Sequence, residues 1–320
     1  MRYRPLGRTG VTISALSLGT VALGVDYGID APGEFGRPSE ADAIRLVQAA
    51  VERGITLIDT APAYGAAERI VGRAVGRDPR IVIASKIIPP VVGADPRVGP
   101  GGHMGPPLHA SITASLEKSL RALNRDVLDI VQIHNATRET IDDGAMTDAL
   151  VDAKRRGLVR WLGASVYGEE AALGVIRDGR YDVLQVALNA LDQRMAREVL
   201  PAAAAAGVGV IVRSAFLKGA LTPKAQWLPD AMAHVREAAE RARDVLAGGV
   251  WDRLPAAAMR FCLSAPHVAS VLTGARTIAE LDAAMAAEAA DTFDAAVMAK
   301  AAQLAMTDER LLNPSFWPIA

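Results

Sequence analysis

The sequence has little of several features that define other classes of protein. Its 320 residues include one cysteine, Cys262, so no disulfide framework can form within the monomer. The 35 lysines and arginines nearly balance the 36 aspartates and glutamates, and the formal net charge is -1. Such a balance supplies no global field for nucleic acid or an anionic membrane. Neither nucleic acid nor a membrane is expected as a partner.

Long hydrophobic runs are also missing. The longest nearly unbroken one, residues 199–212, contains Pro201 and falls short of the about 20 residues of a spanning helix. Met1-Arg2-Tyr3-Arg4 is not followed by the apolar core of a signal peptide. Cys262 lies in an apolar stretch, which indicates a packed core thiol. We therefore expect a cytoplasmic protein.

Apolar residues are plentiful, at 51% against 22% charged, which allows a large core and excludes a disordered chain. A length of 320 residues exceeds the usual single domain. Barrels of alternating strands and helices, however, often run to about 250 residues or more as one unit. Residues 1–320 are accordingly predicted to form a single domain.

Short apolar runs alternate with helical patterns along the chain. Residues 2–13 indicate a hairpin, and strands are expected at 15–20, 55–59, 81–85, 128–133, 159–165, 182–187, 208–213 and 268–273. Helices are expected at 40–53, 66–76, 109–123, 143–156, 169–178, 196–206, 256–264 and 278–290, with extra ones near 231–247 and 291–305. This order predicts an α/β fold: a (β/α)8 TIM barrel with an N-terminal β-hairpin and extra C-terminal helices.

A doubly wound dinucleotide-binding sheet is the alternative fold. It requires a glycine fingerprint between the first strand and the first helix, and the sequence has none there. The nearest match, residues 99–105, has the wrong spacing and lies in a Pro/Gly-rich stretch, 89–107. A connection of that length favours a substrate-side lid or disorder over regular structure.

Polar residues stand where three of the predicted strands end. Asp59 ends the second strand, with Tyr64 in the turn that follows, and Lys86 and His134 follow the third and fourth strands. Carboxyl ends of barrel strands share one face, so these side chains can converge. A lysine beside a tyrosine lowers the pKa of the phenol, and an aspartate fixes the lysine. Tyr64 is therefore a candidate general acid.

These residues belong to motifs spread over the chain. The motifs are Leu6-Gly7-Arg8-Thr9-Gly10, Leu18-Gly19-Thr20, Asp59-Thr60-Ala61 with Tyr64-Gly65, Ser85-Lys86, Gln132-Ile133-His134-Asn135, Leu162-Gly163-Ala164-Ser165 and Gln185. Together they resemble the pattern of the aldo-keto reductase family. The resemblance implies a catalytic tetrad of Asp59, Tyr64, Lys86 and His134. In it Tyr64 protonates a carbonyl, Lys86 and Asp59 assist, and His134 orients the substrate without a metal.

The resemblance also implies a nicotinamide cofactor. The matching residues are Gly19, Thr20, Asp59, Ser165, Gln185, Arg213, Ser214, Phe216, Leu217, Gly219, Gly274, Arg276 and Thr277. The chain departs from the pattern at Val166, where an asparagine is usual, and at Arg213, where many relatives carry a tyrosine stacked on the nicotinamide. A guanidinium can stack on a flat ring as well. If Arg213 instead faces the substrate, it favours an acidic or phosphorylated one.

Arg276 matches the family's adenosine 2′-phosphate site, and Thr277 begins a helix whose N-terminus favours anions. NADPH is thus the implied cofactor, with NADH possible, because Glu280 and Ala284 replace common family residues. The predicted function is reduction of a small-molecule aldehyde or ketone, or oxidation of a sugar-like alcohol. Two alternatives stay open: a cofactor-sensing regulatory subunit, and an isomerase or lyase without nicotinamide. The terminal aromatics Phe316 and Trp317 either pack on the barrel or line the pocket.

Overall fold

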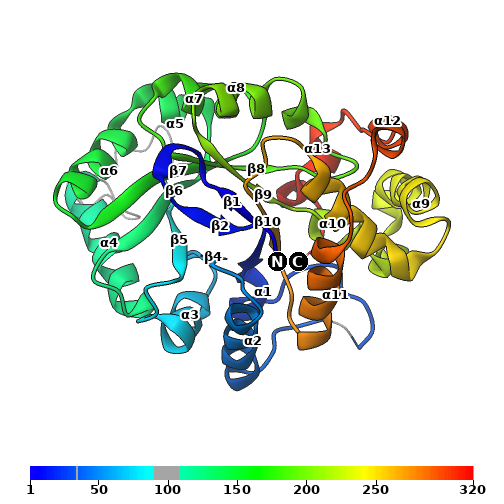
Figure 1. Cartoon of the computed structure of the whole chain (residues 1–320), viewed down its shortest axis with the longest axis horizontal. Helices are drawn as coiled ribbons and strands as arrows, with labels where there is room; N and C mark the ends of the chain where they lie inside the picture. The colour runs from blue at the N-terminus through cyan, green and yellow to red at the C-terminus, as the bar shows by residue number, and fades with distance from the viewer. Residues whose placement is uncertain (34, 90–107, 320) are drawn as a thin grey trace.

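Eight parallel strands close into a barrel in the computed structural model, which describes residues 1–33, 35–89 and 108–319. Each strand pairs with the next along the chain, and the last pairs with the first (Figure 1). The strands are β3 (Leu16–Gly19), β4 (Leu57–Asp59), β5 (Val82–Ile87), β6 (Leu128–Ala136), β7 (Val159–Val166), β8 (Val183–Ala187), β9 (Gly209–Arg213) and β10 (Ser270–Thr273). The predicted TIM barrel is confirmed.

Helices surround the barrel in the order that the sequence predicts (Figure 1). They are α2 (Glu40–Glu52), α3 (Ala67–Val75), α4 (Leu108–Leu123), α6 (Ala145–Arg155), α7 (Glu169–Asp178), α8 (Val199–Ala205), α9 (Ala233–Ala247), α10 (Leu254–Ser264), α11 (Ile278–Ala289) and α12 (Ala295–Ala302). Their apolar faces pack on strands that are buried on both sides; β8, for example, is buried at every position. Cys262 is fully buried in this layer, as predicted.

Three short helices were not predicted: α1 (Val21–Gly24), α5 (Arg138–Asp143) and α13 (Glu309–Leu312). The pattern at 143–156 was read as one helix, but the structure divides this region. Thr137 caps α5, and Gly144 ends it with a left-handed φ of 73°. The next helix therefore begins at Ala145, two residues later than expected.

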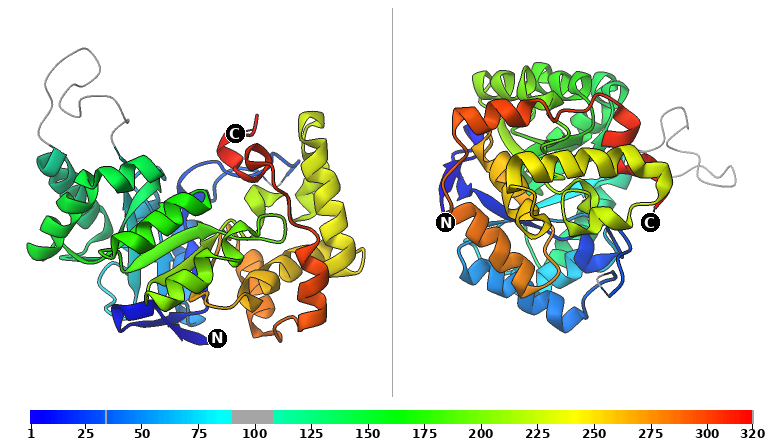
Figure 2. Two further views of the ribbon diagram at one scale, coloured as in Figure 1. Left: turned by 90° about the horizontal axis from the view of Figure 1, so that it is seen from above. Right: turned by 90° about the vertical axis from the view of Figure 1, so that its right-hand side faces the viewer.

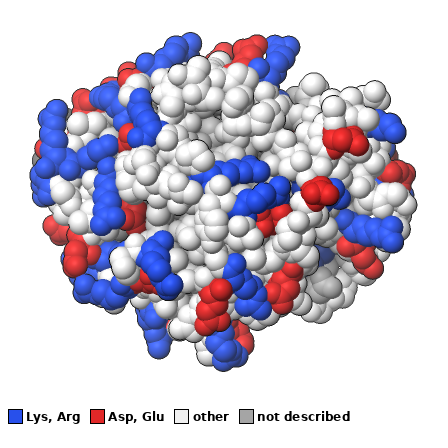
Figure 3. Space-filling model, in the orientation of Figure 1, with Lys and Arg blue, Asp and Glu red and all other residues white. Residues whose placement is uncertain are grey.

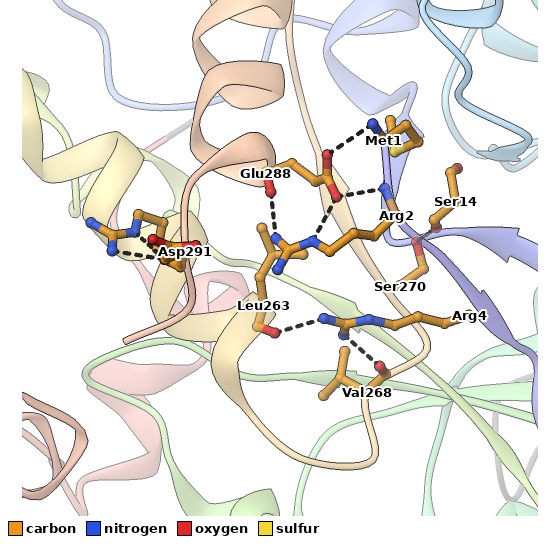
Figure 4. A network of polar contacts seen from close by, with 10 residues as sticks. Met1, Arg2, Arg4, Ser14, Leu263, Val268, Ser270, Glu288 and Asp291 are labelled. Atoms are coloured by element: carbon orange, nitrogen blue, oxygen red, sulfur yellow. Dashed lines mark hydrogen bonds and ion pairs between the residues drawn. The ribbon is translucent and has the colours of Figure 1, made fainter. Parts of the chain in front are cut away.

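The predicted hairpin, β1 (Tyr3–Pro5) and β2 (Thr12–Ser14), closes the amino-terminal end of the barrel. Leu6 and Ile13 are fully buried among interior barrel residues such as Ile211. Figure 4 shows how the hairpin is held: Arg2 donates from its backbone N–H and from Nε to the Glu288 carboxylate, at 2.8 and 2.9 Å. Arg4 donates to the carbonyl oxygens of Leu263 and Val268, near the end of α10 and before β10.

The other end of the barrel is where the strands point their carboxyl ends, and the C-terminal tail reaches it. Figure 2 shows the hairpin and the tail at opposite ends. Trp317 is only 6% exposed, whereas Phe316 is 64% exposed, so one of the two terminal aromatics packs on the barrel. The lid was expected at residues 89–107, and residues 90–107 of this stretch lie outside the described part of the chain.

Basic and acidic side chains are interspersed on the face seen in Figure 3, which includes the hairpin end of the barrel. Within the described part of the chain, no helix is both long and apolar enough to cross a membrane.

Candidate active site

A buried ion pair joins the ends of β4 and β5. Asp59 is 3% exposed and Lys86 is 1% exposed. The Lys86 ammonium donates to Asp59 Oδ1 at 2.5 Å and to the Thr60 carbonyl at 3.0 Å. Burial acts to lower the pKa of Lys86, but the charge of Asp59, and the phenol of Tyr64 beside it, outweigh burial and hold this pKa above its ordinary value. Lys86 is therefore a fixed cation at neutral pH.

The second oxygen of Asp59 accepts two amide donors. Gln132 donates to Oδ2 at 3.0 Å and Gln185 at 2.7 Å. Gln185 is in turn fixed by Ser165, whose hydroxyl donates to its side-chain oxygen at 3.3 Å. With Lys86, three donors satisfy this buried carboxylate, as a buried charge requires. No role was predicted for Gln132, although its spacing of two from His134 along one strand places both on the same face.

The loop that carries Tyr64 is held against helix α1. Tyr64 donates its backbone N–H to Ala61, and its carbonyl accepts from Ala67, both at 3.0 Å. A Cβ placed on Gly24 would lie 1.7 Å from the Tyr64 carbonyl oxygen, and one on Gly65 would lie 2.4 Å from the carbonyl of Gly24. Only glycine fits at these two contacts. They place the Tyr64 ring with its centroid 5.0 Å from the Lys86 ammonium.

His134 approaches Tyr64 from β6, two strands along the barrel from β4. Their ring centroids lie 5.7 Å apart, edge to face at 85°. His134 lies inside β6, which continues to Ala136, and the pairing with β7 shifts between Ile133 and Ala136. Such bulges re-aim side chains next to active sites. Burial, together with the charge of Lys86, lowers the pKa of His134 to about 4. The imidazole is thus neutral at neutral pH.

The structure brings Asp59, Tyr64, Lys86 and His134 together, as the sequence predicts. A phenol is flanked by a cation, which favours release of its proton, and by a neutral imidazole, which can hydrogen-bond a substrate oxygen. In this arrangement Tyr64 can donate a proton to a carbonyl oxygen, and the charges of Lys86 and Asp59 that support it are buried away from water.

Gly19 and Thr20 stand at the end of β3. The backbone N–H and the hydroxyl of Thr20 both donate to the Asp59 carbonyl oxygen at 3.0 Å. These bonds tie the first strand to the second at the active-site end. Thr20 is fully buried, so in this structure its hydroxyl supports Asp59.

Arg213 ends β9 and lies across the end of β7. Its guanidinium stacks on the Tyr167 ring, 3.9 Å from the centroid, and donates to the carbonyl of Val166 at 2.9 Å and to the hydroxyl of Ser214 at 3.2 Å. The sequence reading did not single out Tyr167. An aromatic residue directly after a barrel strand was the available signal, because strand ends carry the functional side chains.

The loop after β9 has an unusual backbone. Ser214, Leu217 and Lys218 have positive φ values of 61°, 44° and 56°, followed by Gly219 at 105°. Residues other than glycine are strained in such conformations, by about 1–3 kcal/mol each, and they cluster at ligand sites. Within the loop, the N–H groups of Leu217 and Gly219 donate to the carbonyl oxygens of Ser214 and Phe216, at 2.8 and 2.9 Å. The positive φ values make this loop, which includes Phe216, a candidate ligand-binding segment.

Gly274, Arg276 and Thr277 connect β10 to α11. Thr277 caps the helix by accepting the N–H of Glu280 at 3.1 Å. The Glu280 carboxylate accepts the backbone N–H of Arg276 at 2.6 Å and pairs with its guanidinium at 3.2 Å. The structure thus gives Arg276 an internal carboxylate as partner, which the sequence reading did not foresee.

A cavity of about 440 Å³ lies between the segments that follow β6 and β7 and the C-terminal tail, and none of the four tetrad residues is among those that line it. Polar and charged side chains line it together with one aromatic ring. They include Asn135, Arg138, Tyr167, Glu169, Glu309 and Asn313. Asn135 directly follows His134, and Tyr167 is the residue on which Arg213 stacks.

Comparisons with known proteins concern the family and the fold of the chain. The model of the "Aldo/keto reductase family" matches residues 15–305. The chain is similar to the NADH-specific methylglyoxal reductase of Escherichia coli (strain K12), 30% identical over 69% of each chain. It is 27% identical to the D-threo-aldose 1-dehydrogenase of a Pseudomonas species, over 86% of this chain and 92% of the other. The holo form of the aldo-keto reductase AKR11C1 from Bacillus halodurans superposes with a TM-score of 0.76, at 26% identity, covering 96% and 97% of the chains.

Proposed function

Because the chain belongs to the aldo/keto reductase family, whose members are nicotinamide-dependent oxidoreductases, we propose that it interconverts a small carbonyl compound and its alcohol with Tyr64 as the general acid. The observation that carries this proposal is the buried Lys86–Asp59 pair beside the Tyr64 ring. Burying an ion pair such as Lys86–Asp59 costs free energy. A protein that only binds the cofactor does not need a buried cation beside a tyrosine.

The residues at the carboxyl end of the barrel fit a nicotinamide dinucleotide. The side chains of Ser165 and Gln185 supply hydroxyl and amide groups, the guanidinium of Arg213 supplies a planar cation, and the strained loop from Ser214 to Gly219 suits a pyrophosphate. When bound, the nicotinamide supplies the hydride. The resemblance implies NADPH as the cofactor. The choice between NADPH and NADH depends on the Arg276–Glu280 pair.

In the reducing direction Tyr64 gives its proton to the carbonyl oxygen. Lys86 stabilises the phenolate that remains, and Asp59, with its three donors, keeps the ammonium in place. His134, neutral because its pKa is near 4, orients the carbonyl by a hydrogen bond and does not compete as an acid. A positioned acid contributes about 10²–10⁴ in rate, and orientation of the reactants supplies much of the rest.

For the substrate we propose a small polar molecule, an aldehyde, a ketone or a sugar-like alcohol. The support is the cavity after β6 and β7, where the amides of Asn135 and Asn313 and the carboxylates of Glu169 and Glu309 suit hydroxyl groups better than an apolar chain. Two similar proteins are named for methylglyoxal and for an aldose. A cytoplasmic location and a single domain over residues 1–320 complete the proposal; the lone, buried Cys262 is consistent with a reducing compartment.

The test has two steps. Quenching of protein fluorescence is titrated with NADH and with NADPH, and a panel of aldehydes, ketones and aldoses is then assayed for cofactor oxidation or reduction. We expect binding and turnover. Binding without turnover on any compound would favour the cofactor-sensing subunit, and no binding of either cofactor would favour the isomerase or lyase.

A further inference from the structure

The loops after the seventh and eighth strands are where TIM barrels commonly bind phosphate, together with a helix N-terminus. Here those loops follow β9 and β10, and the helix is α11. The loop after β9 has the strained backbone described above. The connection after β10 is different, because a side chain of the protein already occupies the anion-binding position there.

That side chain is Glu280. One of its oxygens accepts the backbone N–H of Arg276, and the other pairs with the Arg276 guanidinium. The same guanidinium donates to the Gly36 carbonyl at 3.4 Å. Arg276 is 14% exposed and Glu280 is 40% exposed. An approaching ligand therefore meets a carboxylate first, and the cation behind it is already neutralised.

From this arrangement we infer that Glu280 is a specificity-determining residue that selects NADH over NADPH. The inference rests on the proposed function, since it concerns the cofactor of the same site. A ribose 2′-hydroxyl can donate a hydrogen bond to a carboxylate, which is how dinucleotide-binding proteins commonly recognise NAD. A 2′-phosphate beside Glu280 meets like charge and must displace it from Arg276.

This inference replaces NADPH, the cofactor implied by the resemblance. The sequence reading assigned Arg276 to the 2′-phosphate as an available cation, and the structure pairs that cation with Glu280 four residues later on α11. The pair is built into the start of the helix, because Glu280 also donates its N–H to the capping hydroxyl of Thr277.

The experiment measures dissociation constants of NADH and NADPH by fluorescence titration of three proteins. They are the wild type, Glu280→Gln and, as matched control, Asp282→Asn. Glutamine keeps an acceptor for the Arg276 N–H and removes the charge. Asp282 lies on the same helix and pairs with Arg53 at 2.7 Å, so the control removes an equal charge from another ion pair. Competition by adenosine 2′-phosphate and by adenosine 5′-phosphate tests the adenosine end alone.

We expect the wild type to bind NADH at least about tenfold more tightly than NADPH, because like-charge contacts oppose the extra phosphate. Glu280→Gln should narrow that ratio at least about tenfold, mainly by tighter NADPH binding, and adenosine 2′-phosphate should compete better. Asp282→Asn should leave the ratio within about twofold. A wild type that prefers NADPH, or a ratio unchanged by Glu280→Gln, would overturn the inference. Failure of both cofactors to bind the wild type would overturn the proposed function itself, and the inference with it.

Discussion

The contact between Gly24 and the Tyr64 loop allows the position of the general acid to be tested without touching the acid. In Gly24→Ala, the new Cβ would begin 1.7 Å from the Tyr64 carbonyl oxygen and 2.8 Å from the Ala67 nitrogen. Real Cβ atoms essentially never approach closer than 3.0 Å, so α1 and the loop must separate by about 1.3 Å. A misplacement of about 1 Å can reduce the rate about 10²-fold. We therefore expect kcat/KM to fall about 10²-fold, with the Kd of the cofactor changed only a few-fold.

The control for this variant is Gly209→Ala, which creates a clash at the opposite end of the barrel. Its Cβ would lie 2.6 Å from Leu6 Cδ1 and 2.8 Å from the Leu6 backbone, under the hairpin. Overpacking of this kind costs about 1–3 kcal/mol of stability. Its Tm should fall, while kcat/KM per folded molecule stays near the wild-type value. If Gly24→Ala kept a native Tm and a wild-type kcat/KM, the contact between Gly24 and the Tyr64 loop would not be what positions the acid.

Three further predictions concern other parts of the molecule. Lys86→Met should fold. The alkaline limb of its remaining pH profile of kcat/KM should move to higher pH, because Tyr64 loses the neighbouring cation. Lys300→Met, at an exposed site, is the control and should keep the wild-type profile. Arg213→Ala should weaken NADH and NADPH about equally, by roughly tenfold; a raised KM with unchanged cofactor Kd values would place Arg213 in the substrate pocket. Glu288→Gln should lower the free energy of unfolding at pH 7 by about 1.5–3 kcal/mol in urea titrations. Burial opposes the charge of Glu288, but hydrogen bonds from Arg2 and the nearby α-amino group hold its pKa below 4.5. The stabilisation is therefore present above pH about 4.5 and is lost as the pH falls through the folded pKa, so the difference between wild type and Glu288→Gln should vanish in acid.

The barrel could be predicted because strand and helix periods alternate along the chain, and the strands are short and mostly apolar. Convergence of Asp59, Lys86 and His134 followed from the same rule, since parallel strands present their carboxyl ends on one face. Helix α5 escaped prediction because its six residues are too few for a helical period to stand out. Its boundary depends on the left-handed Gly144.

Side-chain partners were harder to predict than side-chain positions. Gln132 and Gln185 approach Asp59 from different strands, and no spacing within one strand encodes that meeting. Arg276, in contrast, has a partner close in the sequence. Glu280 is four residues away, the ordinary spacing of a helical ion pair. From the sequence, Glu280 was interpreted only as a departure from the family pattern, and its ion pair with Arg276 was not predicted.

The most direct test of the proposed mechanism is a comparison of Tyr64→Phe with wild type under single-turnover conditions, with the reduced cofactor bound in advance and a carbonyl substrate added. Tyr3→Phe, which removes a phenol hydroxyl bonded to Gly54 in the hairpin region, serves as control. The mechanism predicts that Tyr64→Phe loses at least about 10² in the rate of cofactor oxidation, while its cofactor Kd stays within a few-fold of wild type. Cofactor oxidation at the wild-type rate in Tyr64→Phe would contradict the assignment of Tyr64 as the general acid.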